Sequence, residues 1–175
     1  VYEVIEAKNI FNISYQFINI LVHPKSYIHA IIKLKNGLIK IIAHDTTMKI
    51  PIFNSLYFDS FKEIKSNNID LKKLNNLNLQ SVNVKKFPMI NILKYLPKKN
   101  SLYETIIVST NDTLVNLFLE KKIKFNEIQK ILFQVIKMKE FLKYKKISAK
   151  SLSDITNLDK YVRLKVIKKV YKNIK

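Results

Sequence analysis

The chain has 175 residues, of which 47% are hydrophobic and 26% are charged, so it suits one ordinary domain or two small units. It contains no cysteine, which excludes disulfides, thiolate metal sites and cysteine nucleophiles. Lys, Asn or His interrupts the apolar stretches every few positions. The sequence therefore predicts no transmembrane helix, which needs a run of about 20 apolar residues.

The net charge is strongly positive, at +19 from 32 basic and 13 acidic residues. Such a balance is typical of proteins that bind nucleic acids or anionic membrane surfaces. However, Arg163 is the only arginine, and the lysines are spread along the whole chain, whereas phosphate clamps and base readers favour the bidentate guanidinium group. We interpret the charge mainly as a solvated surface, with a lysine-rich module that binds RNA or an anionic surface as the alternative.

The first predicted element is a helix over residues 1–11. Apolar residues recur there at helical spacing, and Glu3 and Glu6 lie three residues apart on one face. Carboxylates in a first helical turn commonly complement the helix macrodipole. A carboxylate at the edge of a packed face is also a possible metal ligand, and from the residues alone both interpretations remain open.

Three short strands are expected next. Residues 17–23 are rich in β-favouring side chains and end before Pro24. Residues 26–35 and 38–43 flank Asn36-Gly37, the dipeptide favoured in a type I′ turn because both central residues need positive φ. The three segments predict one small sheet. The second hairpin arm does not alternate cleanly between apolar and polar residues, so we expect it to be covered on both faces.

Two histidines, His23 and His29, bracket the turn between the first two predicted strands. A histidine near a strand end is more often a structural hydrogen-bonding group than a catalyst.

Residues 44–58 predict a loop that runs into a short helix, with Met48 and Pro51 near its start, where proline is tolerated. Met48 is equally consistent with a core residue and with a pocket residue.

The remainder of the chain is a polar stretch followed by helices. Residues 59–86 are rich in Lys, Asn and Ser and predict a connector that contains a domain boundary. Helical periodicity then predicts four amphipathic helices, over residues 88–96, 103–121, 126–144 and 153–172. The third is expected to bury an apolar stripe made of Ile128, Ile131, Leu132, Val135, Ile136 and Met138, and the fourth a stripe made of Tyr161, Leu164, Val166, Ile167 and Val170. The predicted fold class is α+β, with a small β-sheet and flanking helices over residues 1–58 and a four-helix bundle over residues 87–175.

Three motifs resemble those of one enzyme family in order and spacing. They are Glu3-Val4-Ile5-Glu6-Ala7, the segment from Leu21 to His29, and Met48-Lys49-Ile50-Pro51-Ile52. The chain resembles the central part of 1-deoxy-D-xylulose 5-phosphate reductoisomerase, and weaker similarity continues toward its C-terminus. The resemblance implies an enzyme of non-mevalonate isoprenoid synthesis that rearranges this phosphosugar and reduces the resulting aldehyde with NADPH, giving 2-C-methyl-D-erythritol 4-phosphate.

The resemblance also implies that parts of the enzyme are absent from this sequence. In the family an N-terminal Rossmann domain binds NADPH, and an Asp-Ser-Glu motif supplies two of the three metal-binding carboxylates. The third carboxylate belongs to the glutamate that Glu3 matches, and this sequence begins just before it, with Val1. We therefore expect a fragment whose residues 1–58 are a partial catalytic and metal-binding domain, and which is inactive alone.

By this resemblance, Glu3 is expected to bind Mg²⁺ or Mn²⁺ and, through the metal, the substrate. Glu6 would either orient Glu3 or simply cap the helix. His29 is expected to support catalysis, and Met48 to line the substrate pocket. Because Thr46-Thr47-Met48-Lys49 replaces the family's Pro-Asp-Met-Arg, the local chemistry of this pocket is expected to differ.

Within the predicted bundle, Ser109-Thr110-Asn111-Asp112 stands where the family usually has Asn-Ala-Ala-Asn-Glu, and we interpret it as structural. The family is usually dimeric, so the resemblance implies a homodimer, in a bacterial cytoplasm or a plastid. An inactive remnant of the enzyme is a second alternative, which the departures in the pocket segment favour.

Overall fold

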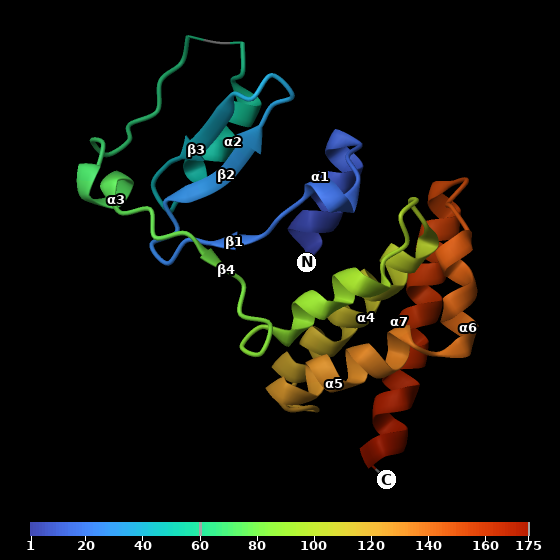
Figure 1. The fold of residues 1–175 in the computed structure, drawn as a ribbon. Helices are drawn as coiled ribbons and strands as arrows, with labels where there is room; N and C mark the ends of the chain where they lie inside the picture. The colour runs from blue at the N-terminus through green and yellow to red at the C-terminus, as the bar shows by residue number, and fades with distance from the viewer. Residues whose placement is uncertain (60, 175) are drawn as a thin grey trace. The chain divides into compact units, whose positions relative to one another are not determined.

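The computed structural model describes residues 1–59 and 61–174, which form two compact units (Figure 1). The helical unit comprises Val1–Asn19 and Val84–Lys175, and the β unit comprises Ile20–Asn83. The α+β class predicted from the sequence is confirmed. One boundary, between Asn83 and Val84, falls within the predicted connector, but a second follows Asn19, so that residues 1–19 group with the helices and not with the strands.

The helical unit is built on four longer elements and several short ones. They are α1 (Tyr2–Phe11), η1 (Tyr15–Phe17), η2 (Pro88–Tyr95), α4 (Leu102–Leu119), α5 (Phe125–Ile136), α6 (Lys139–Leu142), η3 (Lys143–Lys146) and α7 (Leu152–Ile174). Helix α4 packs against both α5 and α7, as Figure 1 shows. Its start is fixed by a capping box in which Ser101 and Glu104 exchange hydrogen bonds with backbone amides.

The core of the helical unit comes from apolar stripes that follow the helical period. The predicted stripe of α5 is buried, from Ile128 to Ile136. In α7 the buried residues recur four apart, at Leu158, Val162, Val166 and Val170. The predicted stripe of α7 was partly wrong, because Tyr161 and Leu164 are exposed.

The predicted helix over residues 126–144 was also wrong in its length, because α5 ends at Ile136 and Met138 has an extended backbone. The reason lies in Phe141, which is fully buried. In a continuous helix Phe141 would follow Leu132 by roughly two and a half turns and would point to the opposite side. The break turns its ring into the core that Leu132 already occupies.

A buried ion pair fastens α1 to the start of α4. The Lys8 ammonium lies 3.3 Å from a Glu104 carboxylate oxygen, and their side chains are only 4% and 10% exposed. The same ammonium donates to the Asn100 side-chain oxygen, and the Tyr15 hydroxyl donates to Glu104 at 2.8 Å. Burial, reinforced by the Glu104 charge, raises the pKa of Tyr15, so its hydroxyl keeps its proton.

A second polar cluster ties α4 to α7. Arg163 contacts both carboxylate oxygens of Asp159 through Nε at 2.9 Å and reaches Asp112 through Nη2 at 3.4 Å. The Ser109 hydroxyl donates to Asp159 at 2.7 Å. The Arg163 guanidinium, helped by the Ser109 hydroxyl, holds the pKa of Asp159 below its ordinary value.

The β unit contains two separate two-stranded sheets. Its elements are β1 (Leu21–Val22), β2 (Ile28–Lys33), β3 (Ile39–Ala43), α2 (Lys49–Leu56), α3 (Leu71–Asn75) and β4 (Gln80–Ser81). Strand β2 pairs with β3, and β1 pairs with β4. The single three-stranded sheet predicted from the sequence was therefore wrong. Strand β1 covers only a small part of residues 17–23, since Phe17 belongs to η1 and residues 18–20 belong to no strand.

The hairpin of β2 and β3 is confirmed, but its turn is not type I′. Gly37 has φ of +87°, whereas Asn36 does not have positive φ. The Gly37 amide donates to Leu34 at 3.0 Å, and the Leu34 amide donates to Leu38 at 2.8 Å. This is a three-residue loop, a type I turn followed by a left-handed glycine. The Asn36 side chain accepts from the Leu38 amide, which favours this turn.

Strand β3 was expected to be covered on both faces, and this was wrong because Ile39, Ile41 and Ile42 are all exposed by about half.

Residues 59–86 are more than a connector, since they supply α3 and the strand β4 that completes the second sheet. Among the residues that the structure describes, no helix is long and apolar enough to span a membrane.

We predict that Lys8→Met lowers the free energy of unfolding by about 3 kcal/mol, because it leaves the Glu104 carboxylate buried without its cation. Urea unfolding followed by circular dichroism measures this. The matched control is Lys122→Met, which removes a lysine from an exposed pair with Glu120 and should leave stability unchanged. Equal effects of the two substitutions would contradict the anchoring role of Lys8.

We predict that Asp159→Asn destabilises the protein by about 1.5 kcal/mol near neutral pH. Because the pKa of Asp159 is lowered by folding, its contribution is present above the ordinary carboxyl value of 3.8 and is lost as the pH falls through the lower folded value. The wild type and the variant should therefore converge in acid.

Thermal unfolding measured near pH 7 and near pH 2 tests this convergence. The conservative variant Arg163→Lys keeps the charge and loses the two parallel contacts, so an intermediate stability is expected. A stability difference between Asp159→Asn and wild type that persists in strong acid would show that the carboxylate charge is not the cause.

Candidate functional site

The two glutamates singled out in the sequence both lie on α1 and are both exposed. Glu3 stands in the first turn, and Glu6 follows it by three residues on the same face. The N-terminus of α1 has no side-chain cap hydrogen bond, so neither carboxylate closes this helix by capping it. Val4 and Ile5 are buried beside them, which fixes the direction in which the exposed face of α1 points.

A cavity of about 370 Å³ lies next to Glu3 in the helical unit. Its lining is mostly apolar and includes Met89, Ile92 and Leu132, with Glu3 and Asn111 as polar members. Tyr2 also lines this cavity and donates its hydroxyl to the carbonyl of Val108 at 3.3 Å. Burial and the nearby Asp112 charge raise the pKa of Tyr2, so this hydroxyl stays protonated and acts as a donor.

The segment Ser109-Thr110-Asn111-Asp112 lies on α4, where its polar side chains serve two different surfaces. Ser109 and Asp112 contact the partners on α7 described above, as expected for structural residues. Asn111 instead lines the cavity beside Glu3. The Thr110 hydroxyl is fully buried and has no hydrogen-bond partner among the described residues.

His23 lies in the β unit at the turn after β1. Its Nδ1 accepts from the backbone amides of Tyr27 and Ile28 at 2.9 and 3.1 Å. These contacts close the turn that contains Pro24 and the left-handed Ser26. They supply a structural role, and they require a neutral ring protonated on Nε2.

His29 lies in β2 and contacts a residue that the sequence analysis did not single out, His44. The two rings are stacked, with centroids 3.6 Å apart and planes 3° apart. His29 Nε2 lies 3.2 Å from the backbone oxygen of His44, and His44 Nδ1 lies 2.7 Å from the backbone oxygen of Asp45. No spacing rule links residues 29 and 44, so only the strand register could have revealed this pair.

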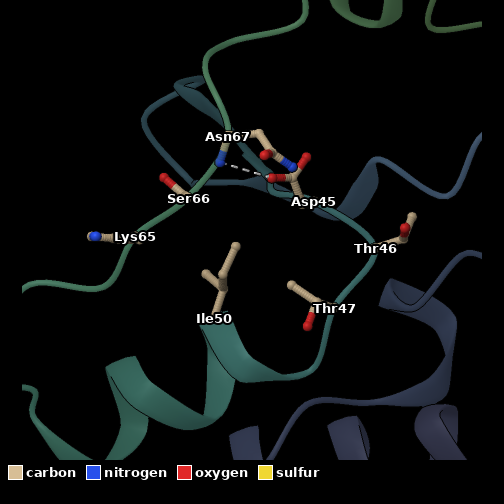
Figure 2. Close-up of a pocket in the computed structure, with 7 residues that line it drawn as sticks. All are labelled: Asp45, Thr46, Thr47, Ile50, Lys65, Ser66 and Asn67. Carbon is tan, nitrogen blue, oxygen red and sulfur yellow. Dashed lines mark hydrogen bonds between the residues drawn. The ribbon is translucent and has the colours of Figure 1, made fainter.

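A second cavity, of about 340 Å³, adjoins the segment that resembles the family's substrate pocket. It is lined by Asp45, Thr46, Thr47, Ile50, Lys65, Ser66 and Asn67, which Figure 2 shows. The Asn67 amide donates to the Asp45 carboxylate at 3.2 Å, and this bond fastens the two sides of the cavity. Ile50 points into the space from the start of α2, whereas Thr46 and Lys65 point away from it (Figure 2).

Met48 precedes α2 and is 69% exposed, so it is not a core residue. It does not line the cavity of Figure 2 either. Among residues 1–59 and 61–174 the structure contains no group of three or more His, Asp or Glu side chains that could hold a metal ion. Glu3 is therefore an isolated candidate ligand within the described chain.

The fold and these sites define a helical domain that carries two exposed glutamates on α1 and is joined to a small β unit with a polar cavity. A family model described as the DXP reductoisomerase C-terminal domain matches residues 45–165. A 1-deoxy-D-xylulose 5-phosphate reductoisomerase of Pelagibacter ubique is 54% identical over 166 residues, which are 95% of this chain and 43% of that protein.

Solved structures agree with the sequence matches. The reductoisomerase of Zymomonas mobilis, in complex with NADPH, matches with a TM-score of 0.77 and 26% identity over 96% of this chain and 43% of the other. A DOX-P reductoisomerase in complex with NADPH, fosmidomycin and magnesium has the same fold, with a TM-score of 0.83 and 24% identity over 97% of this chain and 42% of that chain.

The chain belongs to the 1-deoxy-D-xylulose 5-phosphate reductoisomerase family, so the resemblance described from its motifs is confirmed. It spans less than half the length of the relatives it matches.

Proposed function

We propose that this chain is the C-terminal part of a reductoisomerase that converts 1-deoxy-D-xylulose 5-phosphate to 2-C-methyl-D-erythritol 4-phosphate with NADPH and a divalent cation. The observation that carries this proposal is the family match over most of the chain, with Glu3 exposed at the first turn of α1. The complexes of the solved relatives with NADPH and with magnesium support the choice of cofactors.

The proposed metal site needs ligands beyond those that the described residues bring together. Glu3 offers a hard oxygen ligand of the kind that Mg²⁺ or Mn²⁺ prefers, but the described chain contains no group of three or more His, Asp or Glu side chains that could hold the ion. When bound, the cation would act as a Lewis acid that holds the substrate oxygens. In this proposal Glu3 contributes one ligand, and Glu6 helps to orient it from the next turn.

The β unit would contribute groups that contact the phosphosugar. His29 can hydrogen-bond a substrate oxygen through its free ring nitrogen, in a supporting role. The cavity in Figure 2 offers the hydroxyls of Thr47 and Ser66 beside the start of α2. Met48 is exposed next to this cavity and is proposed to contact the substrate from outside it.

A homodimer is part of the proposal, and the composition of the β unit supports it. Among the described residues of this unit, Tyr27 is the only large hydrophobic side chain that is buried. On one face of the hairpin Ile31, Ile39 and Ile41 are exposed by 39%, 55% and 49%. Pairing β2 with β3 places these three side chains together, since Ile31 lies opposite Ile41. Covering this face with a second copy would remove it from water.

The proposed activity predicts that the 175-residue polypeptide alone shows no NADPH oxidation with the phosphosugar and Mg²⁺. A chimaera that adds the part of the Pelagibacter ubique relative outside the matched region should be active. In this chimaera Glu3→Gln should lower activity by at least about 100-fold, because even a residue that only orients a metal ligand is worth about 10 to 100-fold.

The matched comparison is Glu6→Gln, on the same exposed face of α1, for which a smaller loss, within about 10 to 100-fold, is expected because Glu6 only helps to orient Glu3. Turnover by the 175-residue chain, or full activity of the Glu3→Gln chimaera, would overturn the proposed role of this chain.

The proposed dimer predicts that Ile41→Lys halves the mass of the protein in light scattering coupled to gel filtration, because a charge is placed in the apolar face of the hairpin. Leu164→Lys is the control, since Leu164 is 59% exposed on α7 and lies in the helical unit. A monomeric wild type, or a dimer that survives Ile41→Lys, would contradict this arrangement.

A further inference from the structure

His29 is the extra residue of a β-bulge. Ile28 pairs with Ala43 and Ala30 pairs with Ile42, so two steps along β2 match one step along β3. A bulge re-aims the side chain of the inserted residue and is common beside functional sites. Here it brings the ring of His29 against the ring of His44, which follows the last residue of β3.

The hydrogen bonds of the pair determine where each ring carries its proton. A carbonyl oxygen only accepts hydrogen bonds, so the ring nitrogen that contacts it must donate. His29 Nε2 contacts the backbone oxygen of His44 and therefore carries hydrogen. His44 Nδ1 contacts the backbone oxygen of Asp45 and therefore carries hydrogen too. The contacts thus place hydrogen on different nitrogens of the two rings, Nε2 in His29 and Nδ1 in His44.

The stacking holds this arrangement in place. Parallel rings with centroids 3.6 Å apart restrict rotation of the His29 ring about its side-chain bond. With Nε2 engaged, Nδ1 of His29 retains a lone pair, and no group in the described part of the chain donates to it.

We infer that His44 is a positioning residue for His29: its backbone oxygen and its ring hold His29 as the neutral Nε2–H tautomer, with Nδ1 presented to a ligand. The ligand group that fits is therefore a hydrogen-bond donor, such as a sugar hydroxyl, and not a phosphate or carboxylate oxygen. The identity of that ligand rests on the proposed function, whereas the tautomers do not.

Long-range ¹H–¹⁵N correlation spectra of the ¹⁵N-histidine-labelled 175-residue protein test this directly, because they separate protonated from unprotonated ring nitrogens. The chain has only three histidines, each assigned by a single His→Gln substitution. We expect Nε2–H for His23 and His29 and Nδ1–H for His44. An Nδ1–H form or an equal mixture at His29 would overturn the inference.

Two substitutions at His44 distinguish the effect of its ring on the His29 tautomer from the effect of its backbone oxygen. His44→Phe keeps a stacked ring, and the Nε2–H form of His29 should persist in it. His44→Ala removes the ring and should give a mixture of tautomers, with Nδ1–H contributing at least about a third. If the Ala variant keeps a pure Nε2–H form, the backbone oxygen alone suffices and the role of the ring is overturned. The amide signals of Leu34 and Leu38 report that the hairpin remains folded.

The ligand is tested by adding 1-deoxy-D-xylulose 5-phosphate to the ¹⁵N-histidine-labelled chimaera, which restores the part of the enzyme outside this chain, with inorganic phosphate as the control. A donor hydroxyl should shift the Nδ1 signal of His29 toward the protonated type, and phosphate should not. The absence of a shift with the phosphosugar would overturn the ligand assignment even if the tautomers are as expected. Failure of the proposed function would be seen separately, as an inactive chimaera with the expected tautomers.

Discussion

The position of α1 depends on the buried ion pair between Lys8 and Glu104. A helix of ten residues without a side-chain cap is marginal in water, so α1 needs its tertiary contacts to exist. Removing two charges from water costs several kcal/mol, and the attraction between them offsets this only when their remaining hydrogen bonds are made. Asn100 and Tyr15 complete the network here. Because Glu3 lies in the same turn as the buried Val4 and Ile5, the helical unit determines where this carboxylate points.

The two units differ in how they bury apolar surface. The helical unit has a continuous core, in which α4 supplies Tyr103, Ile106, Ile107 and Leu114, all fully buried. Burial raises the pKa of the Tyr103 hydroxyl to about 12, and this hydroxyl donates to the backbone of Ile136 at 2.6 Å. The β unit instead leaves most of its isoleucines exposed. A unit of this size with so small a core needs another surface to cover it.

Local sequence patterns predicted individual helices and the hairpin better than they predicted which distant segments pair. The stripe of α5 and the hairpin around Gly37 follow from helical spacing and from one turn dipeptide, and both were found. The pairing of β1 with β4 joins residues about sixty positions apart, and no local signal encodes such a contact. The end of α5 was missed because burial of Phe141 outweighed the continuing helical pattern.

In the candidate site, too, local motifs were easier to predict from the sequence than contacts between distant residues. Glu3, Glu6 and His29 were identified through motifs, and the structure places them on an exposed helix and on a bulged strand. His44 was missed because its role depends on the register shift at His29, which sequence spacing does not reveal. The type I turn at Asn36 was missed for a related reason, since Asn36-Gly37 suits two turn types and the loop length decides between them.

Several positively charged side chains make contacts within the protein that its composition did not reveal. The only arginine, Arg163, already contacts Asp159 and Asp112 through its guanidinium group and is therefore not available to bind a phosphate. Several lysines lie over aromatic rings of the same chain, with Lys145 4.8 Å from the Tyr103 ring and Lys137 5.4 Å from the Tyr95 ring. Lysine stems that pack along rings leave their charged heads in water, which favours solubility. The charge of this chain therefore describes its surface, whereas its family follows from the order of its motifs.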